Sequence, residues 1–167
     1  MLVLASSALA IQCGPQLPIP CVDAPCECAG GICELDCGGQ ASCAPACEGA
    51  ESCNASCAGA GCDFTCKSGT NCAVSCGDAC KVSCSSTSTC GATCGAGCTY
   101  TCDNVNDCAP TLGDGGTAVC TSVGSCDVTC TGTCSVTCTS VGNCNVTCAT
   151  GNATMCPGGR RVCGGGC

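Results

Sequence analysis

The chain has 167 residues, of which 31 are cysteine and only two, one Tyr and one Phe, are aromatic. This cysteine content is far above the level that marks a disulfide scaffold, and so few aromatic residues exclude an ordinary hydrophobic core. A net charge of −8 with four basic residues argues against nucleic acid and anionic membranes as partners. The sequence has no histidine, which excludes Ser-His-Asp and Cys-His nucleophilic sites.

Residues 1–10 form a short apolar run that ends in the small-residue pattern Ala8-Leu9-Ala10. We interpret this run as the hydrophobic region and cleavage site of a signal peptide. It is shorter than the roughly 20 apolar residues that a transmembrane helix needs, so membrane insertion is not expected. The sequence therefore predicts a secreted or cell-surface protein in an oxidising compartment, where disulfides form and persist.

The two ends of the chain lack the pattern of its middle. Residues 11–32 contain four prolines and no repeat. Because proline lacks the N–H donor of a β-ladder, this stretch predicts an irregular N-terminal cap. Residues 157–167, PGGRRVCGGGC, predict a Gly-rich C-terminal tail or a partial coil.

Residues 33–156 repeat with a period of about 18 residues. The unit Cys-x-Val-Thr-Cys occurs at 126–130, 134–138 and 144–148, separated by three and then five residues. Alternation within the unit places both cysteines and the hydrophobic residue on one face, and Ser or Thr on the other, as in a β-strand. A fixed period of this length is typical of a solenoid. We predict an all-β parallel β-solenoid (β-helix) of seven coils, with two short strands per coil and an interior filled by disulfides.

Each coil has four cysteine positions, which we number first to fourth in chain order, and cysteines at the same position form a column along the rod. One coil suggests how the columns pair. In residues 108–120 the second column holds Leu112 and the third holds Gly116, so both are lost together while the first and fourth remain. We therefore hypothesise that the second column pairs with the third, and the first with the fourth, within each coil. The resulting pairs are Cys33 with Cys47, Cys37 with Cys43, Cys53 with Cys66, Cys57 with Cys62, Cys72 with Cys84, Cys76 with Cys80, Cys90 with Cys102, Cys94 with Cys98, Cys108 with Cys120, Cys126 with Cys138, Cys130 with Cys134, and Cys144 with Cys156.

Seven cysteines remain outside this scheme. Four of them are expected to close an irregular first turn in a pairing that the sequence leaves open: Cys13, Cys21, Cys26 and Cys28. Near the other end, Cys148, Cys163 and Cys167 are candidates for intermolecular bonds or free thiols. The total of 31 is odd, so at least one cysteine has no partner within the chain.

The Thr residues of the outward face suggest a second function. The chain resembles the beetle-type antifreeze proteins in architecture, because in those proteins a disulfide-filled β-solenoid presents Thr-Cys-Thr triplets to ice. Here the triplet occurs at 129–131 and 137–139 only. The resemblance implies candidate ice-facing rows at Thr93, Thr101, Thr129, Thr131, Thr137, Thr139 and Thr147.

These observations favour a structural role over an enzyme. A rod filled by disulfides has no cleft in which carboxylates could acquire shifted pKa values, so we expect no catalytic site, cofactor, bound metal or small-molecule substrate. No amphipathic helix or charged plug blunts the C-terminal end of the predicted ladder, and open edges invite strand addition. We therefore predict a rigid rod that stacks end to end into a homopolymer, either a fibre or a surface layer. The alternatives are ice binding and a thiolate metal-binding protein.

Overall fold

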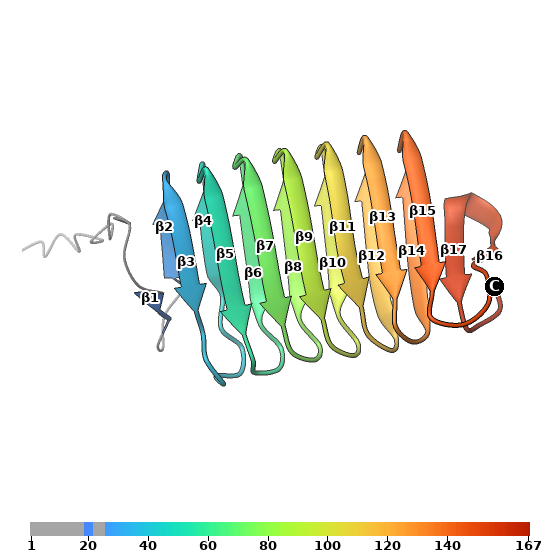
Figure 1. Ribbon diagram of the computed structural model, residues 1–167, viewed down its shortest axis with the longest axis horizontal. Helices are drawn as coiled ribbons and strands as arrows, with labels where there is room; N and C mark the ends of the chain where they lie inside the picture. The colour runs from blue at the N-terminus through green and yellow to red at the C-terminus, as the bar shows by residue number, and fades with distance from the viewer. Residues whose placement is uncertain (1–18, 22–25) are drawn as a thin grey trace, which may run out of the picture.

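The protein is an all-β parallel β-solenoid, as the periodicity predicts. The computed structural model describes residues 19–21 and 26–167, so the expected signal peptide and Cys13 lie outside the described residues. Two parallel sheets form the opposite walls of a flattened coil, and the chain passes from one wall to the other twice in each repeat (Figure 1). In the described part of the chain, no helix is long and apolar enough to cross a membrane.

Odd-numbered strands build one wall and even-numbered strands build most of the other. Sheet A has eight strands: β1 (Ile19–Pro20), β3 (Ile32–Asp36), β5 (Ser52–Cys57), β7 (Asn71–Cys76), β9 (Thr89–Cys94), β11 (Asp107–Leu112), β13 (Ser125–Cys130) and β15 (Asn143–Cys148). Sheet B has nine: β2 (Cys26–Ala29), β4 (Pro45–Glu48), β6 (Asp63–Lys67), β8 (Lys81–Ser85), β10 (Thr99–Asp103), β12 (Gly116–Thr121), β14 (Cys134–Thr139), β17 (Arg160–Cys163) and β16 (Thr154–Met155).

Each strand alternates buried and exposed residues with the parity expected from the sequence. In β13 the buried residues are Cys126, Val128 and Cys130, and their register partners in β15 are Cys144, Val146 and Cys148. Parallel pairing in register therefore stacks like residues along the rod, at roughly 4.8 Å per coil. The inner face consists of sulfur and apolar side chains, most of them small.

The interior keeps a constant width by matching large residues with small ones. The coil that holds Phe64 has Ala55 at the central inner position of its other strand, and the coil that holds Tyr100 has Ala92 there. The buried Tyr100 hydroxyl donates a hydrogen bond to the Cys90 carbonyl oxygen at 2.9 Å. Two of the coils without an aromatic residue use two valines, at 74 and 82 and at 128 and 136. Interiors packed to crystal density tolerate little change in total volume, which explains this compensation.

The coil at 108–120 replaces one disulfide by packing. Leu112 is fully buried, and a Cβ added at Gly116 would lie 2.9 Å from the Leu112 Cβ. Leucine therefore occupies the space that two cysteine side chains fill in other coils. The same coil contains Pro110, and the ladder from β11 to β13 skips residues 109 and 110, although the ladder to β9 is complete. Proline has no N–H to donate, which accounts for the gap.

The five-residue loops have a fixed conformation. Their second residue has a positive φ in five successive loops: Ser68, Ser86, Asn104, Ser122 and Ser140. Their third residue turns inward, so that Val105 and Val123 are buried beside the disulfides. The loop edge of the rod is thus a packed wall rather than a row of free loops.

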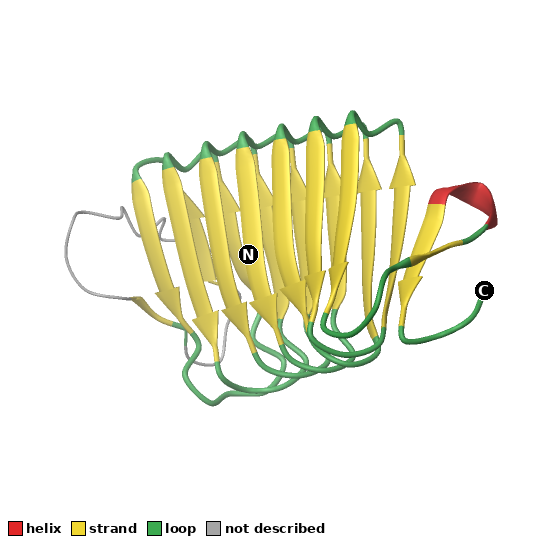
Figure 2. Cartoon of the chain, turned by 45° about the vertical axis from the view of Figure 1, so that its right-hand side comes forward, coloured by secondary structure: helices red, strands yellow, loops and turns green. Residues whose placement is uncertain are grey.

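The C-terminal residues form an ordered cap on sheet B. After a short 3-10 helix (Pro157–Gly159), β17 runs antiparallel to β14, and β16 adds to its far side. Figure 2 shows these elements at the C-terminal end of the stacked coils. Arg161 pairs with Val136, so both residues lie on the inner face of the sheet. An inward-pointing charge and a reversed strand direction are two ways to stop a ladder. The expectation of an unprotected C-terminal end is therefore wrong for sheet B and correct only for β15 in sheet A.

The packing at Leu112 and Gly116 predicts how a disulfide could be restored there. Gly116→Cys alone should lower the melting temperature, because overpacking against Leu112 costs about 1–3 kcal/mol. Leu112→Cys combined with Gly116→Cys should form a new disulfide and recover that loss. Non-reducing peptide mass spectrometry and thermal melts check both results. Alkylation of the introduced cysteines, in addition to the free thiols Cys94 and Cys98 of the parent chain, would contradict the structure.

Candidate functional surfaces and the disulfide framework

Disulfides cross-link every coil, and part of the predicted pairing is confirmed. Fourteen disulfides join the described cysteines. The structure contains four of the predicted pairs between the second and third columns: Cys37–Cys43, Cys57–Cys62, Cys76–Cys80 and Cys130–Cys134. This is the pairing that the joint loss of Leu112 and Gly116 identified.

The predicted pairing of the first with the fourth column is wrong. The structure does not contain the pairs Cys33–Cys47, Cys53–Cys66, Cys72–Cys84, Cys90–Cys102, Cys108–Cys120, Cys126–Cys138 and Cys144–Cys156. Instead, the fourth column of each coil bonds the first column of the next. These bonds are Cys28–Cys33, Cys47–Cys53, Cys66–Cys72, Cys84–Cys90, Cys102–Cys108, Cys120–Cys126 and Cys138–Cys144.

The path of the chain from one coil to the next explains this pairing of the fourth column with the first. Cys66 lies near the end of β6 in sheet B, and the five-residue loop leads directly to Cys72 near the start of β7 in sheet A, with 6.6 Å between their Cα atoms. A first-column cysteine thus lies near two fourth-column cysteines, that of its own coil and that of the preceding coil. The short loop brings it next to the cysteine of the preceding coil. The coil at 108–120 keeps both columns, so it could not distinguish the two schemes. Each loop is consequently fastened at its base by a disulfide.

The cysteines near the chain ends are also bonded. Cys148 bonds Cys163 and Cys156 bonds Cys167, so the prediction that Cys148, Cys163 and Cys167 are free or intermolecular is wrong. Both bonds attach the cap to the last coil. At the other end, Cys21 bonds Cys26, and the open pairing of Cys28 is settled by its bond to Cys33.

Two sulfur clusters could be mistaken for metal sites. Three sulfurs lie within 4.8 Å of one another at Cys21, Cys37 and Cys43, and again at Cys130, Cys134 and Cys163. All six belong to disulfides, and a metal requires thiolates. The framework therefore favours a cross-linked rod over a thiolate metal store.

One predicted disulfide is absent although both of its cysteines are in place. Cys94 and Cys98 carry free thiols, and both side chains are buried. Burial, followed by the charge and hydrogen bond of Cys98, raises the pKa of Cys94 to about 12. The Cys94 sulfur therefore remains protonated at neutral pH.

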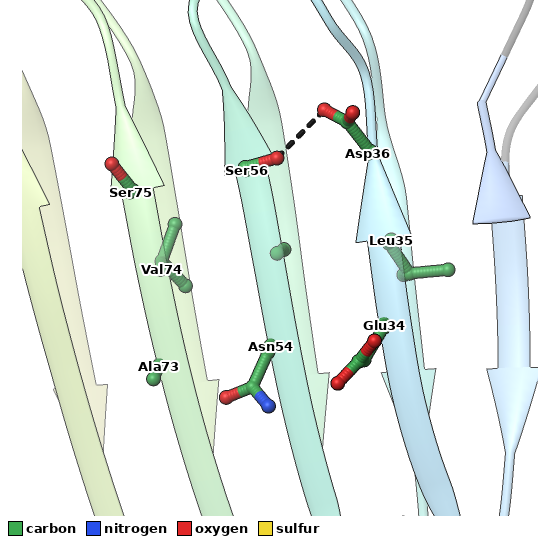
Figure 3. Close-up of a pocket in the computed structure, with 9 residues that line it drawn as sticks. Glu34, Leu35, Asp36, Asn54, Ser56, Ala73, Val74 and Ser75 are labelled. Carbon is green, nitrogen blue, oxygen red and sulfur yellow. Dashed lines mark hydrogen bonds between the residues drawn. The ribbon is translucent and has the colours of Figure 1, made fainter. Parts of the chain in front are cut away.

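The outer face of sheet A carries an unbroken row of hydroxyl groups. Its members are aligned by strand register on six successive strands: Ser56, Ser75, Thr93, Thr111, Thr129 and Thr147. Beside the first two lies a shallow groove of about 360 Å³. Figure 3 shows Asp36, Ser56 and Ser75 in line on three strands, with a hydrogen bond of 2.7 Å from the Ser56 hydroxyl to the Asp36 carboxylate.

The candidate ice-facing residues do not share one plane. Thr93, Thr129 and Thr147 belong to the sheet A row, whereas Thr101, Thr137 and Thr139 lie on sheet B, and Thr131 lies in a turn. The sequence reasoning missed Thr111, which completes the row on sheet A. The signal was its position two residues before Gly113, the same spacing as Thr93 to Gly95.

Two aspartates fasten successive coils: Asp114, in a three-residue turn at the edge of the rod opposite the five-residue loops (the turn edge), and Asp127, on β13. The Asp114 carboxylate accepts hydrogen bonds from the Thr133 hydroxyl at 2.6 Å and the Thr133 backbone N–H at 2.9 Å. These bonds, the hydroxyl first, hold the pKa of Asp114 below its ordinary value. Ser125 and then Asn145 do the same for the pKa of Asp127. Because hydrogen bonds favour the ionised form, these carboxylates are structural fasteners and not candidate general acids.

Charge is distributed unevenly between the two ends of the rod. Five exposed carboxylates lie on the first described coils: Glu27, Glu34, Asp36, Glu48 and Glu51. Residues 128–167 contain no acidic residue, and Arg160 and Arg161 lie on the cap strand β17. The N-terminal end is thus negative, and the C-terminal end carries the only two arginines of the sequence.

Comparison with known protein families, curated proteins and solved structures found no match for this chain. The resemblance to beetle-type antifreeze proteins therefore remains one of architecture, and the β-solenoid of the structure agrees with it at that level.

Tryptic digestion without reduction should distinguish the two pairing schemes. Cleavage after Lys67 and Lys81 releases the peptide 68–81, which contains Cys72, Cys76 and Cys80. The structure predicts that Cys66–Cys72 holds this peptide to the N-terminal fragment. Pairing within coils would instead hold it to the fragment that begins at Val82, through Cys84. Mass spectrometry of the urea-denatured, alkylated digest checks which partner the peptide retains.

Proposed function

We propose that the protein is a rigid extracellular structural rod whose copies associate end to end. The observation that supports this most directly is the staggered disulfide framework, which fastens each coil to the next at the loop edge. Disulfides at this density form and persist in oxidising compartments. The rod shape and the cross-links fit an extracellular structural protein.

Rigidity follows from two independent sets of connections between coils. Both sheets have parallel ladders in register along the stack, and a disulfide lies at the base of each five-residue loop. Bending the rod would have to break hydrogen bonds between the strands of one sheet, while the disulfides between successive coils resist their separation. A disulfide that closes a five-residue loop stabilises the fold by less than the ~3 kcal/mol expected for a 15-residue loop. The contribution recurs in each coil.

End-to-end association is supported by one open strand. β15 is the last strand of sheet A, and its inner residues Cys144, Val146 and Cys148 are half-buried, whereas their partners in β13 are fully buried. The strand bears no charge and no proline. An uncharged edge of six residues is a template for another strand.

The complementary edge lies at the other end of the rod. β1 covers only Leu35 and Asp36 of β3, so within the described residues the outer edge of β3 is free at 32–34. Ile32 is 51% exposed there, and Glu34 lies next to it along the strand. The acidic N-terminal end of one copy would meet the arginine-bearing end of another, an arrangement that favours open, head-to-tail filaments.

Placing negative charge on β15 tests this association. Asn145→Glu combined with Thr147→Glu would oppose the acidic N-terminal end, so association should weaken about two- to thirtyfold, since like charges opposed across strands each cost roughly 0.2–1 kcal/mol. Ala73→Glu with Ser75→Glu is the matched control, because these residues occupy the same rows on the internal strand β7. Sedimentation and electron microscopy of oxidised protein provide the measurement. Wild-type protein that stays monomeric at high concentration would refute end-to-end association.

The hydroxyl row on sheet A supports ice binding as a second candidate. Six aligned hydroxyl residues without an intervening charge form the flat, regular surface that the resemblance to antifreeze proteins implies. Thr111→Arg, in the middle of the row, should then abolish thermal hysteresis. Thr117→Arg on the opposite sheet should leave it unchanged, and wild-type protein without thermal hysteresis or ice shaping would remove this candidate.

A further inference from the structure

The middle of the rod contains a pair of thiols in an otherwise bonded framework. In the described part of the chain, Cys94 and Cys98 are the only cysteines outside disulfides. Their side chains are 6% and 0% exposed. They flank the three-residue turn between β9 and β10, in the coil that also contains Tyr100.

The backbone at this pair is equivalent to one that holds a disulfide. Cys94 is in register with Cys76, and Thr99 is in register with Lys81, which places Cys98 above Cys80. Cys76 and Cys80 are bonded, with their Cα atoms 6.4 Å apart. Cys130 and Cys134 are bonded across a turn of the same length, at 6.0 Å. The ladders on both sides therefore hold Cys94 and Cys98 where a disulfide can form.

The thiols are in contact with each other and covered by their turn. Cys94 and Cys98 are hydrogen-bonded through sulfur, and the Cys98 thiol also donates to the Gly77 carbonyl oxygen at 3.3 Å. The turn is held from both neighbouring coils: Ala96 N–H donates to the Asp78 carboxylate and Gly97 N–H donates to the Asp114 carbonyl oxygen, each at 2.8 Å. Thiol exchange requires a thiolate within reach of the reagent, so a closed turn slows reaction.

We propose that Cys94 and Cys98 are a modification site, a dithiol that a low-molecular-weight disulfide converts into a further cross-link of the rod. One sulfur attacks the small disulfide, forms a mixed disulfide and releases one small thiol. The second sulfur then displaces the other small thiol and closes the bond. The two cysteines lose two electrons and two protons, and the small disulfide gains both to become two thiols.

The location gives this cross-link a mechanical consequence. The next coil has Leu112 and Gly116 at the equivalent positions, so with the dithiol open two consecutive coils lack a disulfide at the turn edge. Bonds at this edge resume at Cys130–Cys134. The centre of the rod should therefore open locally more readily than either flank, and oxidation should reduce that difference.

Thiol counting on the full oxidised chain tests the proposal. After denaturation without reductant, a maleimide should label Cys94 and Cys98, and the native protein should label slowly. Incubation with oxidised glutathione should remove both labels, and the peptide that contains Cys94 and Cys98 should lose two hydrogens and retain no glutathione. Cys98→Ser should instead retain one glutathione on Cys94. A bond from either cysteine to a third cysteine, or a glutathione retained on Cys94 or Cys98 of the wild type, would overturn the proposal.

The role of the turn is tested separately. Asp78→Ala removes the acceptor of Ala96 N–H and should speed native labelling about two- to tenfold, as expected for the loss of one hydrogen bond. Asp103→Ala, on the loop edge, is the matched control and should have no effect. Equal rates in both variants would contradict access through the turn. If the isolated protein already has the bond Cys94–Cys98, graded reduction must open it before the fourteen others, and a different order would refute convertibility.

Discussion

The reach of a disulfide sets the thickness of this molecule. Bonded Cα atoms lie 6.4 Å apart in Cys76–Cys80 and 6.6 Å apart in Cys66–Cys72, one bond at each edge of a coil. The two sheets can separate no further than these bonds allow, and the space left between them admits only small residues or one large residue opposite a small one. Sulfur thus replaces the hydrophobic core that a chain with two aromatic residues cannot build.

The sequence predicted those features of the fold that depend on alternation and period. A residue of the Cys-x-Val-Thr-Cys unit has only two directions to face, so the inner position of Val128 and the outer position of Thr129 followed from parity alone. The period of about 18 residues fixed which cysteines stack along the rod. The loss of Leu112 and Gly116 together identified the pairs across the turn edge, because a pair that fills one space is lost as a pair.

Other features depend on three-dimensional details that leave no mark on periodicity. The choice between Cys72–Cys66 and Cys72–Cys84 depends on where the chain climbs from one sheet to the other, and both schemes use the same columns. The cap was missed because glycines and arginines at 157–167 resemble a tail, whereas the antiparallel pairing of β17 becomes evident only once β14 offers an edge. The candidate Thr residues were chosen by triplet motif, yet register along a sheet determines which of them are neighbours.

The volume match between Phe64 and Ala55, and between Tyr100 and Ala92, lies within single coils. Each coil also supplies one cysteine to the bond before it and one to the bond after it. A duplication or deletion of a whole repeat would therefore keep every interior filled and every bridge complete. Such a chain can lengthen or shorten in units of one coil without compensating substitutions in the other coils. The length of the rod is in this sense set by the number of repeats in the sequence.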